Sequence, residues 1–168
     1  MPTHYEGSRD TVRALNAYIN LVRASDSVLG RMSAQLELEG LTMGQFGVLE
    51  SLLHLGPMCQ HTLGRKLLRS GGNITLVVDN LEKHGWVRRE RLESDHRMMM
   101  IHLTPAGREL IAEVFPKHAK AIKNEMSRLN AAEQETLRRL TRKLGLDGEK
   151  LRRERRKKEK EHDSNSTQ

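Results

Sequence analysis

The chain has 168 residues, of which 36% are hydrophobic, so it is long enough for one domain with its own core. No run approaches the roughly 18 consecutive apolar residues of a membrane-spanning helix, which excludes a membrane span. The net charge of +7 favours a polyanionic partner without choosing between DNA, RNA and an anionic membrane surface. Aromatic residues make up only 3%, which argues against recognition of single strands by base stacking.

The single cysteine cannot form an internal disulfide, and the sequence shows no basic start followed by an apolar segment of the secretory type. Both features lead us to expect a cytoplasmic protein. No nucleophile paired with a base, no phosphate-binding loop and no metal-ligand spacing is visible. We therefore expect no enzymatic activity, no cofactor and no metal.

The N-terminal part is expected to form a short arm over residues 1–10 and a long helix within residues 11–40. Apolar residues recur there at helical spacing, namely Val12, Leu15, Ile19, Val22, Leu29 and Leu36. The next helix begins near Thr42, which forms a capping box with Gln45, and it ends at Gly56 and Pro57.

Cys59 follows that helix end and is expected to stand at the start of another helix. A thiol in this position can have a lowered pKa, so redox sensing through Cys59 is an alternative to a structural thiol. His54, Cys59 and His61 lie within eight residues, but their spacing matches no standard pair of zinc ligands. We interpret them as part of a polar loop.

The stretch from Leu63 to Thr104 predicts two short helices joined by a tight turn and followed by a basic β-hairpin. In the second helix, Ser70 is the expected N-cap and Gly85 the expected C′ residue. Ile74, Val77, Val78 and Leu81 recur at helical spacing and predict the buried side. The residues left facing outward are Asn73, Thr75, Leu76 and Asn80.

That outward face is suited to the major groove of DNA. Asn73 can pair bidentately with adenine, and Thr75 can contact a phosphate or a thymine methyl group. Gly71 and Gly72 have no side chains, so the amides at the helix start can approach a phosphate closely. The alternative is an ordinary helical hairpin with a glycine-containing turn.

The predicted hairpin has strands over Val87 to Arg91 and Met98 to Leu103, with a charged tip over Leu92 to Arg97. Four arginines lie on it, namely Arg88, Arg89, Arg91 and Arg97. Arginine at a hairpin tip fits the narrow minor groove, and Asp95 could hold the guanidinium of Arg97 extended. A solvated surface hairpin is the alternative, but it does not explain why the charge directly follows the groove-facing helix.

Thr104 and Pro105 predict the N-cap and first residue of a helix that runs to about Leu129, and Asn130 with Glu133 opens another helix. Residues 149–168 carry eight basic and five acidic residues, and we expect a frayed or disordered tail that adds attraction to phosphates.

The apolar stripes of the terminal helices predict a two-fold dimer. Its recognition helices would lie about one DNA turn apart, on an approximately palindromic site. The alternative is that these helices fold back on their own subunit.

Four segments resemble the MarR family of winged helix-turn-helix regulators. They are Leu41 to Leu52, Thr62 to Glu90, the pattern Asp95-x-Arg97, and His102 to Leu110. The resemblance covers about residues 10 to 148. It implies a homodimer, sequence-specific binding to double-stranded DNA, usually repression, and often release by a small phenolic or lipophilic compound or by oxidation.

The resemblance also implies an effector pocket between the dimerisation helices and the DNA-binding domain. We name the scarce aromatic residues Tyr18, Phe46 and Trp86 as candidates to line it. No feature of the sequence identifies the compound.

The expected fold is mainly α with a small β-hairpin wing. A winged helix-turn-helix domain spans residues 41–104, and dimerisation helices occupy residues 11–40 and 105–148. The expected function is a homodimeric repressor; a nonspecific nucleoid-type or RNA-binding module is the alternative. The expected DNA-binding residues are Ser70, Gly72, Asn73, Thr75, Leu76, Asn80, Arg88, Arg89, Asp95 and Arg97.

Overall fold

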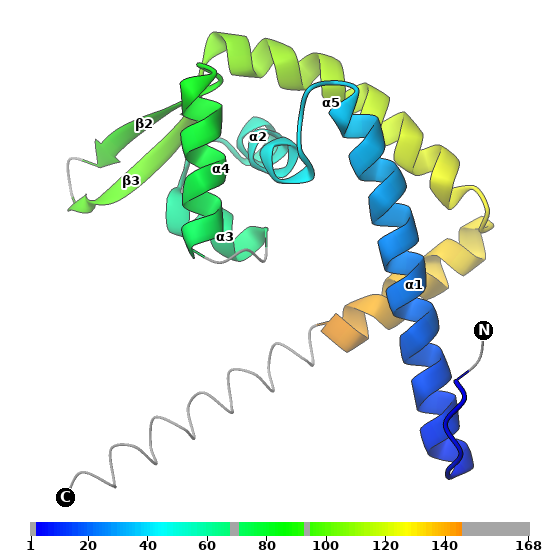
Figure 1. Ribbon diagram of the computed structural model, residues 1–168. Coiled ribbons are helices and arrows are strands. Elements are labelled where there is room, and N and C mark those ends of the chain that lie inside the picture. Colours follow the sequence, from blue (N-terminus) through cyan, green and yellow to red (C-terminus); the bar gives the residue numbers. More distant parts are fainter. Residues whose placement is uncertain (1–2, 68–70, 93–94, 146–168) are drawn as a thin grey trace, which may run out of the picture. The chain divides into compact units, whose positions relative to one another are not determined.

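The computed structural model describes residues 3–67, 71–92 and 95–145 (Figure 1). Ser70 and the charged tail over residues 149–168 lie outside the described residues, as do the side chains of residues 71–72 and 95–97. The chain forms two units, Met1–Lys123 and Asn124–Gln168. The first unit contains every element up to most of α5, so it holds the whole predicted DNA-binding domain.

The first helix, α1, spans Arg9–Glu37, two residues earlier at its start than the sequence predicted. The earlier start follows from Ser8, whose hydroxyl accepts a hydrogen bond from the amide of Thr11 at 3.2 Å and so caps the helix. Only Met32 and Leu36 of α1 are buried. Within one protomer, Val22 and Leu29 of the predicted apolar stripe are exposed, and Val12, Leu15 and Ile19 are half-buried.

Helix α2 spans Met43–Leu55 and confirms the predicted capping box. The amide of Thr42 donates to Gln45 Oε1 at 2.8 Å, and the amide of Gln45 donates to Thr42 Oγ1 at 3.2 Å. The helix ends at Gly56, whose φ of 76° lies in the left-handed region that glycine tolerates. Most of its residues are buried, so α2 occupies the centre of the first unit.

A three-stranded antiparallel sheet follows, with β1 at Met58–Cys59, β2 at Val87–Leu92 and β3 at Asp95–Leu103 in the order β1-β3-β2. The sequence predicted the hairpin of β2 and β3 but not β1, which pairs Met58 with Ile101. The predicted tip over residues 92–97 was wrong, because Leu92 belongs to β2 and β3 already begins at Asp95. The strands therefore extend further along the hairpin than expected.

Helix α3 spans Gln60–Lys66 and α4 spans Gly71–Lys83. The side chains of Ile74, Val78 and Leu81 are buried, as their spacing predicted, whereas Val77 of the same predicted set is only half-buried against the core. Gly85, with φ of 72°, terminates the last turn, and its amide donates to the carbonyl of Glu82 at 2.9 Å.

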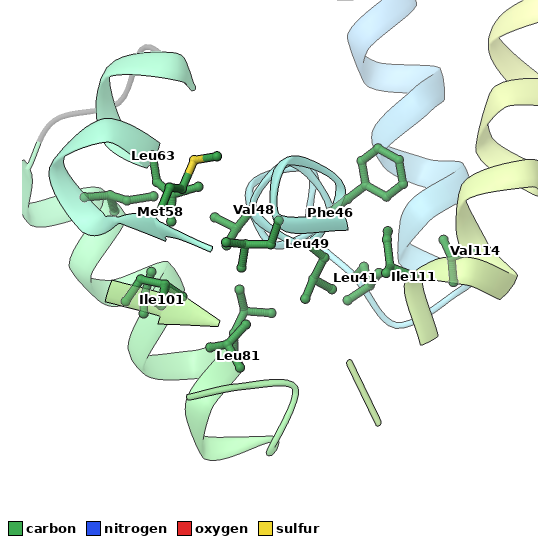
Figure 2. Packing of buried hydrophobic residues seen from close by; sticks show 14 of the residues in the cluster. Leu41, Phe46, Val48, Leu49, Met58, Leu63, Leu81, Ile101, Ile111 and Val114 are labelled. Atoms are coloured by element: carbon green, nitrogen blue, oxygen red, sulfur yellow. The ribbon is translucent and has the colours of Figure 1, made fainter. Parts of the chain in front are cut away.

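One hydrophobic core connects these elements. Figure 2 shows Val48 and Leu49 of α2 between Met58 and Leu63 on one side and Ile111 on the other. The fully buried members come from the five helices α1 to α5, from β2 and β3, and from the segment before α2: Leu36, Leu41, Val48, Leu49, Leu52, Leu63, Ile74, Val78, Leu81, Val87, Ile101, Ile111 and Val114. This shared core fixes the position of α4 against the sheet.

Helix α5 spans Pro105–Met126 and starts where Thr104 and Pro105 predicted. The Thr104 hydroxyl donates to the carbonyl of Gly85 at 2.6 Å and accepts from the amide of Gly107 at 3.0 Å. A Cβ atom at Gly107 would overlap the carbonyl oxygen of Trp86. The start of α5 is therefore packed directly on the turn between α4 and β2.

In the second unit, the amide of Asn130 donates to Glu133 Oε2 at 2.8 Å and the amide of Glu133 donates to Asn130 Oδ1 at 3.0 Å. This reciprocal cap opens a helix over residues 131–145, as predicted, and α5 ends at Met126 instead of near Leu129. Within the ranges that the structure describes, no helix is both long and apolar enough to cross a membrane.

Candidate nucleic-acid interface

The outer face of α4 consists of exposed side chains. Asn73, Thr75, Leu76 and Asn80 are all exposed, and Leu76 is 65% exposed. The opposite face of α4 is anchored in the core by Ile74, Val78 and Leu81. This arrangement presents polar and apolar groups side by side on a rigid helix, which is how a recognition helix meets base edges in the major groove.

Gln60, at the first position of α3, contacts this outer face. Its amide nitrogen donates to Thr75 Oγ1 at 2.8 Å. Gln60 carries no local signal in the sequence, because residues 60 and 75 meet only through the tertiary packing of α3 on α4. The contact ties one of the predicted base-contacting residues to the neighbouring helix.

Arg89, on β2, occupies a different environment from the one the sequence indicated. Its guanidinium pairs with Asp79 and with Glu82, the latter at 2.6 Å, and its side chain is only 18% exposed. Burial alone would lower the pKa of Arg89, but the hydrogen bonds and negative charges of Asp79 and Glu82 outweigh it and raise the pKa. Arg89 therefore connects the wing to α4 within the protein, instead of standing free for a DNA phosphate.

Arg88 lies on the same strand with its side chain 55% exposed and pairs with Glu90. The hydrogen bond from Arg88 lowers the pKa of Glu90, so the carboxylate stays charged. Because exposed ion pairs are weak, Arg88 can exchange this partner for a phosphate. Asp95 and Arg97 lie in β3, and their side chains are outside the described residues.

A cavity of about 480 Å³ lies between α2 and α5. Its lining is mostly apolar and comprises Met43, Phe46, Gly47, Glu50, Leu67, Phe115, His118, Ala119 and Ile122. Of the three aromatic residues predicted for an effector pocket, Phe46 lines this cavity. Tyr18 is instead 65% exposed on α1, and Trp86 stacks on His84 at a centroid distance of 4.6 Å. The structure thus brings one of the three to the cavity.

His118 is a buried polar group in the cavity wall that the sequence analysis did not single out. Its ring lies 4.4 Å from the ring of Phe46, and its Nδ1 lies 2.7 Å from Gln35 Oε1. Burial lowers the pKa of His118, with the charge of Glu50 acting in the opposite direction. The imidazole is therefore neutral at neutral pH. The only sequence signal was its place within an otherwise apolar helical stripe.

Cys59 precedes α3 as its N-cap without a side-chain capping bond. Its sulfur lies 3.0 Å from the Thr62 hydroxyl, and this hydrogen bond is the main cause that lowers the pKa of the thiol. Among the described residues, no three histidine, cysteine or acidic side chains are grouped so that they could hold a metal ion.

A recognition helix set in a helical core and followed by an antiparallel hairpin defines a winged helix-turn-helix DNA-binding domain. The chain matches the MarR family over residues 41–99. It is 35% identical to the HTH-type transcriptional regulator YkoM of Bacillus subtilis, over 83% of this chain and 90% of the relative. It is 32% identical to the HTH-type transcriptional regulator MhqR of the same organism, over 84% and 97%. The chain belongs to the MarR family of transcriptional regulators, which bind DNA and are not enzymes.

Solved structures agree with this assignment at the level of the fold. The MarR family regulator Sco3205 of Streptomyces coelicolor, crystallised in complex with DNA, superposes with a TM-score of 0.76 at 23% identity. The superposition covers 84% of this chain and 90% of that chain. The predicted fold class, mainly α with a winged helix-turn-helix, is thereby confirmed.

Proposed function

We propose that the protein is a homodimeric repressor that acts in the cytoplasm, binds an approximately palindromic operator and is released by a small phenolic or lipophilic compound. The observation that carries the DNA-binding part is the exposed outer face of α4, opposite the buried side chains of Ile74, Val78 and Leu81. Because α4 is fixed in the core, this face is presented without further rearrangement.

In this proposal the residues divide by the part of the duplex that they meet. Asn73 and Thr75 contact base edges from the start of α4, with Leu76 and Asn80 on the same face. Arg88 contacts the backbone, and Arg97 enters the minor groove with Asp95 two residues before it in the chain. Ser70 and Gly72 precede or open α4, where backbone amides favour a phosphate. Arg89, one of the expected DNA-binding residues, is reassigned to support of the wing.

The dimer is supported by α1. Its exposed side chains include Tyr18 at 65% and Leu29 at 51%, with Leu21 and Val22 also exposed. These four residues recur at helical spacing, so they form one apolar face. A second copy of the chain is the partner that covers such a face with matching chemistry, and a two-fold dimer gives two recognition helices for two half-sites.

The effector part is supported by the cavity between α2 and α5. A volume of about 480 Å³ with an apolar, partly aromatic lining suits a small aromatic compound. The cavity wall joins α5 to α2, and α2 shares the core with α4. A compound that separates α2 from α5 would therefore shift the platform on which α4 rests.

The test is selection of duplexes from a random pool by the full-length protein, followed by footprinting with and without a panel of phenols, quinones and peroxides. The proposal expects enrichment of an inverted repeat and release by some phenols. Arg97→Ala should weaken binding to the enriched duplex by about 1–3 kcal/mol. If Arg97→Ala weakens all duplexes equally and only slightly, the alternative of a nonspecific nucleic-acid-binding module replaces this proposal.

A further inference from the structure

Gln60 connects three elements of the DNA-binding domain through its side-chain amide. Its nitrogen donates to Thr75 on α4 at 2.8 Å, and its oxygen accepts from Nη2 of Arg89 on β2 at 3.4 Å. A guanidinium group can only donate, so the amide oxygen must face Arg89 and the nitrogen must face Thr75. Arg89 is itself held by Asp79 and Glu82, so the orientation of the Gln60 amide is determined.

The orientation of the Gln60 amide fixes the direction of the Thr75 hydroxyl. The hydroxyl oxygen is held toward α3 as the acceptor of the Gln60 amide. The oxygen and the methyl group occupy different positions on the same Cβ atom, and a β-branched side chain has few rotamers in a helix. Thr75 is nevertheless exposed, so the methyl group is the part of the side chain that it presents away from Gln60.

The surroundings of Thr75 favour an uncharged target over a phosphate. The Arg89 guanidinium that reaches Gln60 is already paired with Asp79, one helical turn along α4 from Thr75, and with Glu82, so it offers little attraction to a phosphate there. Leu76, the next residue, is 65% exposed and adds apolar surface to the same face of α4. The thymine 5-methyl group is the apolar group that the major groove offers.

We propose that Thr75 recognises the 5-methyl group of a thymine through its own methyl group, and that Gln60 is the positioning residue that sets this orientation. The inference rests on the proposed function, in which α4 enters the major groove. It decides between the two roles that the sequence left open for Thr75, contact with a phosphate and contact with a thymine.

The test uses two duplexes, the one enriched from the random pool by the wild-type protein and the same duplex with deoxyuridine in place of thymidine. Thr75→Val keeps the methyl group and replaces the hydroxyl by a second methyl, whereas Thr75→Ser keeps the hydroxyl and loses the methyl. We expect Thr75→Val to bind the thymine duplex within about twofold of the wild type. Thr75→Ser should lose about fourfold for each methyl contact, and this deficit should disappear on the uracil duplex.

Two results would overturn the thymine contact: Thr75→Val weakened at least as much as Thr75→Ser, or a Thr75→Ser deficit that is equal on both duplexes. Gln60→Leu tests the positioning role, since it removes the amide that donates to the Thr75 hydroxyl without adding charge. It should reduce the preference for thymine over uracil while the melting temperature stays near that of the wild type. If Gln60→Leu keeps the full preference, or loses it only through unfolding, Gln60 has no positioning role.

The same experiment distinguishes failure of the proposed function from failure of the thymine contact alone. If the wild-type protein enriches no duplex, the proposed function fails and the thymine contact fails with it. If it enriches a duplex that binds all Thr75 variants equally, the proposed function stands and only this inference is rejected.

Discussion

The Nδ1 atom of His118 lies 2.7 Å from the Oε1 atom of Gln35, so a hydrogen bond joins α5 to α1 beside the cavity. The same imidazole packs on Phe46 of α2. One buried side chain in the wall of the candidate effector site thus contacts both α1 and α2. Because the group is titratable and buried, its protonation is coupled to the stability of the fold.

We predict that stability falls as the pH is lowered below about 6.5 and that His118 contributes to the loss. Burial lowers the pKa of His118 in the folded state from its ordinary value of 6.5. At a pH between the lowered pKa of the folded state and the ordinary pKa of the unfolded state, His118 binds a proton in the unfolded chain but not in the folded chain. Acid therefore favours unfolding. Urea denaturation at about pH 7.5 and 5.5 measures this, and His118→Gln should show a smaller loss. An equal loss in both proteins would contradict the prediction.

Gly107→Ala is expected to destabilise the protein by roughly 3 kcal/mol, because its Cβ would overlap the backbone oxygen of Trp86 and neither backbone can move freely. Gly30→Ala is the matched control, since no atom lies within 4 Å of its Cβ position and alanine favours a helix by about 1 kcal/mol. Urea denaturation should show a lower free energy of unfolding for Gly107→Ala and a higher one for Gly30→Ala than for the wild type. Equal effects would mean that α5 does not pack on the α4–β2 turn as described.

Arg89→Leu is expected to cost about 1–2 kcal/mol, because it leaves the carboxylates of Asp79 and Glu82 without their shared partner. Arg88→Leu, on the neighbouring position of β2, removes only an exposed pair with Glu90 and should change stability little. When both variants are folded, DNA affinity should change in the opposite order. Arg88→Leu should lower the affinity for all duplexes more than Arg89→Leu does, because it removes a phosphate contact. The prediction fails if Arg88 proves the more important residue for stability.

Leu29→Glu is expected to convert the dimer to a monomer, because it places a charge within the exposed apolar face of α1. Asn20→Glu is the control, since Asn20 lies on the opposite side of the helix by its spacing from Tyr18 and Leu29. Sedimentation velocity at about 10 µM separates the outcomes. A wild-type protein that already sediments as a monomer would reject the dimer itself.

The elements with local signals could be predicted from the sequence. The capping boxes of Thr42 with Gln45 and of Asn130 with Glu133 are formed by residues three apart, so a single sequence is enough to recognise them. The buried side of α4 followed from the helical period in the same way. These signals placed the winged helix-turn-helix and the exposed face of α4.

The features that the sequence could not give depend on contacts between distant segments. Strand β1 has two residues, too few for any periodicity, and exists because Met58 pairs with Ile101. Strand alternation puts Arg89 on the side of the buried Val87 and Arg88 on the other side, but it does not identify the carboxylates that Arg89 meets. Its partners Asp79 and Glu82 meet it only when α4 packs beside β2. For the same reason, the scarcity of aromatic residues did not show that Phe46 alone of the three lines the cavity.

The central claim is that the outer face of α4 contacts DNA bases, and the most direct measurement is the affinity of Asn73→Ala for the enriched duplex by fluorescence anisotropy. We predict a loss of about 1–3 kcal/mol relative to the wild type, while affinity for an unrelated duplex is unchanged. Asn20→Ala, the same substitution at an exposed position of α1, should bind both duplexes as the wild type does. Equal affinities of Asn73→Ala and Asn20→Ala for the enriched duplex would contradict the account.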